Sequence, residues 1–203
     1  ERDTSQEFAV AVGTTCCNVN YQPLESFCCK VTYRHDAIIS WPGVAVIGRP
    51  FSGKTSVWRT LEATLSLLHP KSPFGVSSIA LHIGALTLGE LYGTFDSARR
   101  EWVDGIVANC YRKILHSEAH DLQVSRLFLV FDGIVDPSWT EHLHTALDES
   151  SILCLGNGES IRHSEWLTVI IESENLKQAT PTIIGRIGLL HFGKSHMNWH
   201  VLF

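Results

Sequence analysis

The sequence predicts an α/β fold in which a parallel β-sheet is flanked by helices. Three observations lead to this prediction. Short segments with the composition of buried strands recur along the chain, at residues 44–47, 76–83, 127–131, 167–171 and 187–191. The run at 127–131 is apolar at every position, which is typical of a strand buried on both faces of a parallel sheet. Segments of helical spacing lie between these strands, and that alternation is characteristic of strand–helix–strand units.

Length and composition indicate one globular domain. The chain has 203 residues, of which 44% are hydrophobic and 18% are charged, as is typical of a folded protein with one sizeable core. The net charge of −5 and the lack of a Lys/Arg run argue against a nucleic-acid partner. No apolar stretch approaches the roughly 20 residues of a membrane span. Because the chain begins with Glu1 and has no signal-type segment, we expect it to be part of a longer protein.

The cysteines and histidines favour neither a disulfide framework nor a zinc site. The six cysteines include two adjacent pairs and no C-x-x-C motif, so we expect reduced thiols in a cytosolic protein. His116 and His120 fall on one face of a predicted helix, but the H-E-x-x-H pattern is absent. We interpret these histidines as surface residues.

The remaining elements follow from local signals. We expect residues 1–40 to be an irregular lead-in and residues 41–203 to form the α/β domain. Helical spacing predicts helices at residues 56–68 and 97–115, and Pro137 is expected to begin another that continues to residue 147. Thr87 and Glu90 have the spacing of a capping box at the start of a short helix. Asn157-Gly158 predicts the turn of a hairpin between residues 152 and 161.

The most informative stretch is a predicted phosphate-binding loop between the first strand and the first helix of this domain. It matches the pattern G-x-x-x-x-G-K-[ST] in the strand–loop–helix setting that the motif requires. Backbone N–H groups of the loop and the start of the following helix would hold phosphate oxygens. Lys54 would reach the β- and γ-phosphates, and the Thr55 hydroxyl would bind Mg²⁺. The residues expected to bind the nucleotide here are Gly48, Arg49, Pro50, Phe51, Ser52, Gly53, Lys54, Thr55 and Ser56.

A second part of the site is expected where the strand at 127–131 ends. Asp132 follows that strand and is predicted to hold the Mg²⁺ of bound ATP or ADP through its water shell. In ATPases that hydrolyse through an Asp-Glu pair, the next residue orients the attacking water, but here it is Gly133. Loss of such a group reduces rates by about 10²–10⁴-fold, so the sequence predicts a site that holds nucleotide and hydrolyses it slowly or not at all. Asp136 is a weaker substitute for the missing carboxylate.

With these residues, the chain resembles an AAA+ module of a dynein heavy chain and is most like the second module of the motor ring. The resemblance runs from about residue 33 to the end and depends on motifs in a fixed order, among which Asp132-Gly133 is the most specific. It implies a P-loop NTPase fold, the AAA+ large subdomain, with the small helical subdomain expected after residue 203. Other motifs that carry the resemblance are Leu88-Gly89-Glu90-Leu91-Tyr92-Gly93, Glu101-Trp102-Val103-Asp104-Gly105, Leu147-Asp148-Glu149, Asn175-Leu176-Lys177-Gln178-Ala179-Thr180 and Gly185-Arg186-Ile187-Gly188.

The resemblance implies a role in ATP-driven, minus-end-directed movement on microtubules. This module would hold a nucleotide and stiffen the ring, and Arg186 would act in trans as an arginine finger on the nucleotide of the adjacent module. Glu172 would stand at the position of the γ-phosphate sensor. The implied partners are the adjacent AAA+ modules of the same heavy chain, microtubules, and the dynein intermediate and light chains. The implied location is the cytoplasm and cytoskeleton, with an axonemal form in a cilium or flagellum favoured.

Two alternatives remain open. Phe51 stands where such loops usually carry glycine, and a left-handed backbone there would strain the chain by about 1–3 kcal/mol. The chain could therefore be a structural module that has lost nucleotide binding. It could also be a free-standing, hydrolysing P-loop NTPase or kinase that uses Asp132 or Asp136 as its base.

Overall fold

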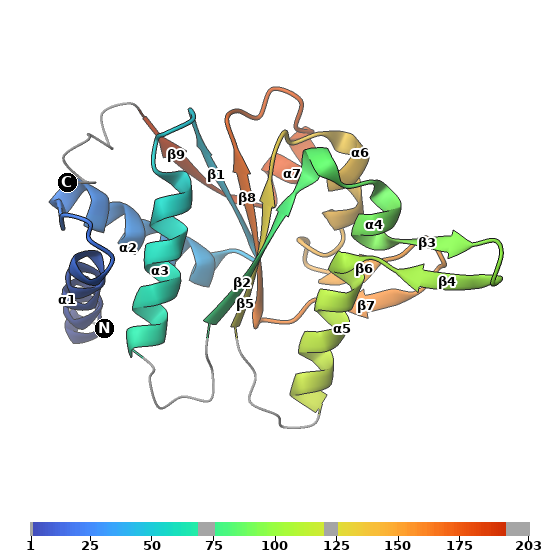
Figure 1. Ribbon diagram of the computed structural model, residues 1–203, viewed down its shortest axis with the longest axis horizontal. Coiled ribbons are helices and arrows are strands. Elements are labelled where there is room, and N and C mark those ends of the chain that lie inside the picture. Colours follow the sequence, from blue (N-terminus) through green and yellow to red (C-terminus); the bar gives the residue numbers. More distant parts are fainter. Residues whose placement is uncertain (1, 69–75, 120–125, 194–203) are drawn as a thin grey trace.

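The computed structural model describes residues 2–68, 76–119 and 126–193. Its centre is a five-stranded sheet with strand order β2-β5-β8-β1-β9, in which all neighbouring strands are parallel (Figure 1). This confirms the predicted α/β fold, and the five strands predicted for the sheet are present. The strands of the sheet are β1 (Gly43–Gly48), β2 (Val76–His82), β5 (Arg126–Asp132), β8 (Leu167–Ser173) and β9 (Gly188–Phe192).

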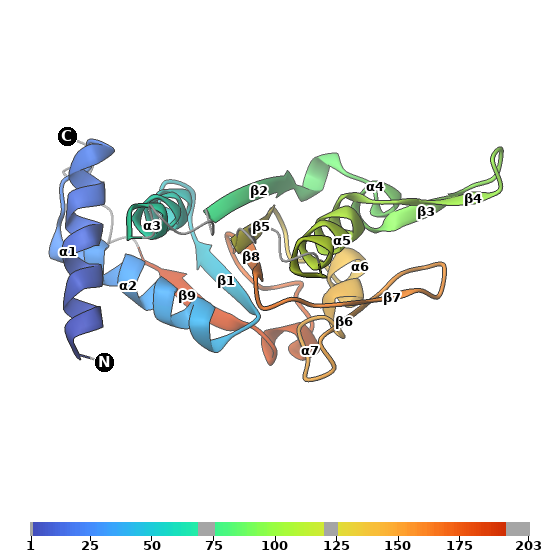
Figure 2. The same cartoon turned by 90° about the horizontal axis from the view of Figure 1, so that it is seen from below.

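Helices cover the sheet in two groups, one on each face (Figure 2). The alternating side chains of β5 join two different cores: Leu129 and Phe131 pack in one, and Phe128 and Val130 pack in the other. Burial on both faces is the reason why this strand is apolar at every inner position. One group consists of α1 (Arg2–Asn18), α2 (Glu25–Ser40) and α3 (Lys54–Leu68), and the other of α4 (Leu88–Tyr92), α5 (Ile106–Ala119), α6 (Pro137–Thr140) and α7 (Pro181–Ile184).

Residues 2–40 are largely helical, so the prediction of an irregular lead-in is wrong. Both α1 and α2 pack against α3, and each buries an apolar stripe. The stripe of α1 includes Phe8, Val12 and Cys16, and that of α2 includes Phe27 and Val31. The four-residue spacing of these side chains is about one helical turn. This signal is present in the sequence, but it is diluted by polar neighbours, and such helices take most of their stability from tertiary packing.

Two predicted helices begin or end elsewhere in the structure. The first part of the helix expected at 97–115 is instead a hairpin, made of β3 (Gly93–Asp96) and β4 (Glu101–Asp104), and α5 begins only at Ile106. Between them, Gly105 lies against α4, where a Cβ atom would approach the Leu91 carbonyl carbon to 2.4 Å. The helix expected at 137–147 ends as α6 at Thr140 and continues as a 3-10 turn, η2 (Glu141–Leu143).

Other local predictions are confirmed. Thr87 and Glu90 form the capping box of α4, which follows a second 3-10 turn, η1 (Ile83–Ala85). The predicted hairpin pairs β6 (Ile152–Cys154) with β7 (Ser160–Arg162), and Gly158 in its turn has a φ of 86°. None of the helices in the described residues is long and apolar enough to cross a membrane.

Candidate nucleotide-binding site

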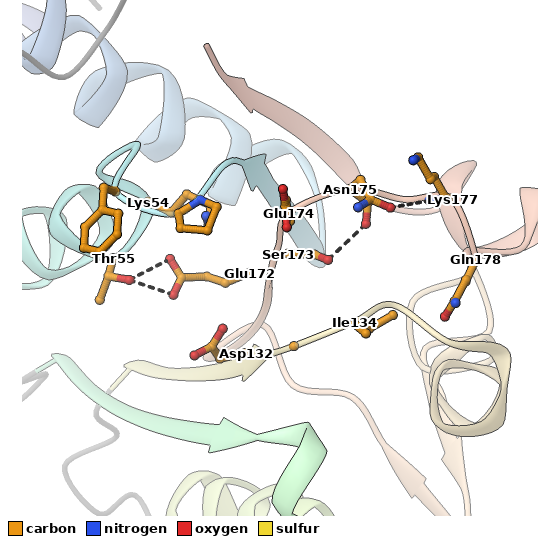
Figure 3. A pocket seen from close by; sticks show the side chains of 13 residues that line it. Lys54, Thr55, Asp132, Ile134, Glu172, Ser173, Glu174, Asn175, Lys177 and Gln178 are labelled. Atoms are coloured by element: carbon orange, nitrogen blue, oxygen red, sulfur yellow. Dashed lines mark hydrogen bonds between the residues drawn. The ribbon is translucent and has the colours of Figure 1, made fainter. Parts of the chain in front are cut away.

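The carboxyl ends of β1, β5 and β8 meet at one edge of the sheet, because parallel strands point the same way. The predicted phosphate-binding loop leaves β1 after Gly48 and enters α3 at Lys54. Asp132 ends β5, and Glu172 lies beside it in register on β8. Candidate residues from three distant parts of the sequence therefore come together at this edge (Figure 3).

These residues surround a hollow of about 570 Å³. Figure 3 shows Lys54, Thr55, Asp132 and Glu172 on its wall. Pro50 and Phe51 line it as well. Gly48 and Arg49 line a neighbouring hollow of about 400 Å³, whereas Ser52 and Gly53 in the loop and Ser56 in the first turn of α3 line neither hollow.

The loop that follows β8 contributes lining residues that sequence reasoning missed. Their common signal is a position directly after the carboxyl end of a buried strand, where ligands bind in open parallel sheets. The end of β9 contributes to the second hollow for the same reason. The lining residues that were not predicted include Ser173, Glu174, Asn175, Lys177 and Gln178 around the first hollow, and His191 and Phe192 around the second.

Lys54 folds back onto the loop that precedes it. Its ammonium group donates hydrogen bonds to the carbonyl oxygens of Gly48, at 2.6 Å, and Arg49, at 3.0 Å. Phosphate oxygens are charged and therefore stronger acceptors than carbonyl oxygens. The lysine already lines the hollow, so a change of rotamer would let it exchange the loop carbonyls for a phosphate group.

Thr55 is held by Glu172. Its hydroxyl donates a hydrogen bond shared by the two carboxylate oxygens, 3.1 Å from Oε2 and 3.4 Å from Oε1. Glu172 is 4% exposed. Burial raises the pKa of its carboxyl group, while the bond from Thr55 and the charge of Arg34 oppose that rise. Because the bond uses the hydroxyl hydrogen of Thr55, the oxygen lone pairs remain available for Mg²⁺.

Arg34 on α2 supplies a positive charge near Glu172, and sequence reasoning missed it. Its side chain is fully buried, and its three guanidinium nitrogens have no hydrogen-bond partner among the described residues. Burial lowers the pKa of Arg34 to about 9, and the charge of Glu172 opposes that change. An arginine on a helix is normally exposed, so nothing in the local sequence marks this one as a buried counter-charge.

Asp132 and Asp136 have different environments. The Asp132 side chain is 57% exposed and lies 3.6 Å from Nδ1 of His82. Asp136 caps α6 by accepting a hydrogen bond from the Ser138 backbone at 2.8 Å, and this bonding lowers the pKa of Asp136. A carboxylate that is already engaged and of lowered pKa is a poor base. Asp136 also lies outside the residues that line the hollow.

The backbone of Gly133 is hydrogen-bonded to β8 and has a positive φ. Its N–H donates to the carbonyl oxygen of Glu172 at 3.0 Å, and its φ is 153°. A Cβ atom at this position would lie 3.2 Å from Cβ of Ile83. The residue after Asp132 is therefore one that other side chains could occupy only with strain.

Phe51 has a left-handed backbone conformation, the one in which we expected a phenylalanine to be strained. Its φ is 62°, and its side chain is completely exposed. Phenylalanine at such a φ costs roughly 1–2 kcal/mol, and here no buried contact of the ring offsets it. The loop nevertheless keeps its strand–loop–helix form, with Lys54 and Thr55 at the start of α3.

Arg186 lies apart from the other candidate residues. It stands between α7 and β9, close to the amino end of β9, whereas the hollow is at the carboxyl ends of the strands. It lines neither of the two hollows. The structure thus brings Lys54, Thr55, Asp132 and Glu172 together and leaves Arg186 at the opposite edge.

Known proteins with sequences similar to this chain include several dynein heavy chains. The chain is 34% identical over 200 residues to dynein axonemal heavy chain 12 of Mus musculus, which covers 97% of the chain. It is 32% identical over 198 residues to dynein axonemal heavy chain 3 of Mus musculus, covering 96% of the chain. It is 31% identical over 185 residues to the dynein-1-beta heavy chain of the flagellar inner arm I1 complex of Chlamydomonas reinhardtii, covering 89%. The chain spans only 6%, 5% and 4% of these relatives, respectively. No family model matches the chain.

Proposed function

Because the chain belongs to the dynein heavy chain family, we propose that residues 41–203 are the large α/β subdomain of an AAA+ module, most like the second module of the motor ring. The module binds ATP or ADP with Mg²⁺ and hydrolyses ATP slowly or not at all. The observation that carries this proposal is Asp132-Gly133 beside the phosphate-binding loop. The carboxylate for the metal stands at the end of β5, and the residue that follows it has no side chain.

The residues around the hollow fit a magnesium nucleotide. Hydroxyl and carboxylate oxygens, as on Thr55 and Asp132, are ligands that Mg²⁺ prefers, and Mg²⁺ would neutralise part of the phosphate charge. Lys54 and the N–H groups of the loop would hold the phosphates. Gly48 packs tightly at the start of the loop, where a Cβ atom would lie 2.7 Å from the Phe192 carbonyl oxygen. That contact keeps the loop close to β9.

The environments of the acidic residues support slow hydrolysis. Asp136 is occupied as the cap of α6, and Glu172 accepts the hydrogen bond of Thr55. Gly133 offers no group to orient a water molecule. A site with these features would bind the nucleotide and lack a free base in the position that follows Asp132, which corresponds to a loss of about 10²–10⁴-fold in rate.

The position of Arg186 supports a role in trans. It lies at the edge of the sheet away from its own hollow, so it would serve a neighbouring module as the arginine finger. In this proposal the module acts within a heavy chain that moves toward microtubule minus ends and assembles with intermediate and light chains. Its relatives are axonemal and flagellar dyneins by name, which supports a cilium or flagellum as the location.

Calorimetry of Mg·ATP binding, with phosphate release followed in the same sample, tests the proposal. The segment is best extended beyond residue 203 through the small subdomain. We expect binding without steady phosphate release. Lys54→Ala should weaken binding about 10- to 100-fold, because it removes charged hydrogen bonds worth about 1.5–3 kcal/mol. Lys113→Ala, on the exposed side of α5, should leave the affinity unchanged.

Two other results would each favour an alternative. Steady phosphate release that Lys54→Ala abolishes would support a hydrolysing NTPase. A thermal melt that does not change with Mg·ATP would support a structural module, because a ligand at 100 times its Kd adds about 2.7 kcal/mol to stability. Phe51 would then be the first position to replace.

A further inference from the structure

The guanidinium group of Arg186 is held by two oxygen atoms from different segments. Nη1 donates to the carbonyl oxygen of Thr182 at 2.9 Å, and Nη2 donates to Oδ2 of Asp148 at 2.8 Å. The side chain of Arg186 is 28% exposed and that of Asp148 is 42% exposed. Each terminal nitrogen carries two hydrogens, so one hydrogen on each remains available to a further acceptor.

Asp148 is also held by hydrogen bonds to the backbone next to it. Its Oδ1 accepts a hydrogen bond from the Glu149 backbone at 2.9 Å, which leaves Oδ2 for the guanidinium group. Its backbone carbonyl accepts from the Ser151 N–H, also at 2.9 Å. The bond from Arg186 lowers the pKa of Asp148. The carboxylate is thus held in one orientation. An ion pair with this short side chain costs less conformational entropy than an exposed pair of two long side chains.

The residues next to Asp148 and Arg186 in the sequence are buried against the start of β1. These contacts fix the position of the ion pair relative to the sheet. Leu147 and Ile187, the residues next to Asp148 and Arg186, are 3% and 2% exposed. Both approach Gly43 at the amino end of β1, where a Cβ atom would lie 3.0 Å from Leu147 and 3.4 Å from Ile187. β1 runs from Gly43 to Gly48, which is about 16 Å at 3.3 Å per residue. The length of this strand therefore separates the pair from the loop of the same module.

From this arrangement we propose that Asp148 is a positioning residue that holds Arg186 in the orientation in which it reaches the nucleotide of the neighbouring module. The inference rests on the proposed role of Arg186 in trans. Asp148 and Thr182 each take one hydrogen of the guanidinium group, and the remaining hydrogens of the two terminal nitrogens meet phosphate oxygens of the neighbour. Asp148 keeps this bond while Arg186 acts, and it touches neither the nucleotide nor the reacting atoms.

The experiment uses the full heavy chain and four variants: Arg186→Ala, Asp148→Asn, the double variant, and Asp96→Asn as a control. Asparagine keeps the oxygen that accepts from Glu149 and removes the charge that holds Arg186. Asp96 is a matched control, because it also accepts from a backbone amide, that of Ala98 at 2.9 Å, and lies 3.8 Å from an arginine, Arg99. The quantity measured is the rate of ATP hydrolysis at the site of the neighbouring module. It is obtained as the part of the total rate that is lost when the phosphate-loop lysine of that module is replaced.

We expect Arg186→Ala to reduce this rate by about 10³-fold or more, as for other arginine fingers. Asp148→Asn should reduce kcat by about 10- to 100-fold, because a displacement on the order of 1 Å can cost about 100-fold, and it should change KM less than about twofold. The double variant should be no slower than Arg186→Ala, since Asp148 acts only through Arg186. Binding of ADP with aluminium fluoride should weaken in parallel with kcat, and Asp96→Asn should match the unmodified chain.

The outcomes separate the inference from the function on which it rests. If Arg186→Ala leaves hydrolysis unchanged, both the role in trans and the inference are wrong. If Arg186→Ala is slow but Asp148→Asn keeps the normal kcat, only the inference is wrong. The same holds if the double variant is tenfold slower than Arg186→Ala, because Asp148 would then act independently.

Discussion

Thr55 at the start of α3 and Glu172 at the end of β8 are joined by a hydrogen bond of 3.1 Å, although they are 117 positions apart in the sequence. The bond links the end of the proposed phosphate-binding loop to β8, the strand beside β1 in the sheet. It orients the hydroxyl group that is proposed to bind Mg²⁺ and keeps a negative charge beside it.

Replacement of the Glu172 carboxylate should change how strongly nucleotide binding depends on Mg²⁺. Glu172→Gln keeps an acceptor for Thr55 but removes a charge that attracts Mg²⁺ and repels phosphate. We expect the ratio of Mg·ATP affinity to metal-free ATP affinity to fall on the order of tenfold, or about 1.4 kcal/mol. Calorimetry with Mg²⁺ and with a chelator measures both affinities. Glu174→Gln is the control, since Glu174 lines the same hollow but is exposed; an equal effect of both variants would contradict the special role of Glu172.

Arg34 and Glu172 should be coupled energetically. Arg34→Met leaves a buried carboxylate without its counter-charge and should destabilise the fold by about 3 kcal/mol or more. Adding Glu172→Gln should recover at least about 1 kcal/mol of this loss, as seen in a double-mutant cycle of denaturant unfolding. The same cycle with Glu174→Gln should be additive. Additivity in the Arg34–Glu172 cycle would mean that the two charges do not stabilise one another.

Phe51→Gly should leave stability unchanged or raise it by up to about 1.5 kcal/mol. Glycine relieves roughly 1–2 kcal/mol of left-handed strain, and its greater freedom in the unfolded chain offsets about 0.5–1 kcal/mol. No buried contact is lost, because the ring is fully exposed. Phe95→Gly in β3, where the side chain is 60% exposed, should instead be destabilising. Equal losses for both variants in denaturant unfolding would show that the Phe51 ring stabilises the loop.

Gly133→Glu should fail to start phosphate release, although it restores the Asp-Glu pair of hydrolysing sites. At a φ of 153°, and with Ile83 close to the added Cβ, we expect strain of about 1–3 kcal/mol. Gly133→Ala should lose the same stability, which separates backbone strain from the effect of the carboxylate. Steady phosphate release by a Gly133→Glu variant of normal stability would show that the missing side chain alone limits hydrolysis.

His163 should make stability depend on pH below neutrality. Burial lowers the pKa of His163 from 6.5 to about 4 in the folded protein, where Nδ1 lies 2.9 Å from the Tyr111 hydroxyl. The unfolded chain therefore binds the proton first as pH falls, and stability is lost between about pH 6.5 and pH 4. The loss attributable to His163 is on the order of 3 kcal/mol. The free energy of unfolding, measured with denaturant across this range, should depend less on pH for His163→Gln than for the unmodified chain.

The parallel sheet, the loop between β1 and α3, and the place of Asp132 at the end of β5 could all be predicted from the sequence, because each follows from residues that are close together in the chain. A buried strand needs a short apolar run, a capping box needs Thr87 and Glu90 three positions apart, and the loop needs its glycines and Lys54 at set spacing. The helices in residues 2–40 had a local signal too, in the four-residue spacing of Phe8 and Val12, but it was too short to outweigh the polar residues around it.

Which distant side chains meet could not be predicted from the sequence. The contact of Thr55 with Glu172, the burial of Arg34 and the ion pair of Asp148 with Arg186 each join segments with no common periodicity or spacing. Such contacts depend on strand order and on how helices pack on the two faces of the sheet. Local patterns set the direction of a side chain within its own element, whereas its charge partner depends on how the elements pack against one another.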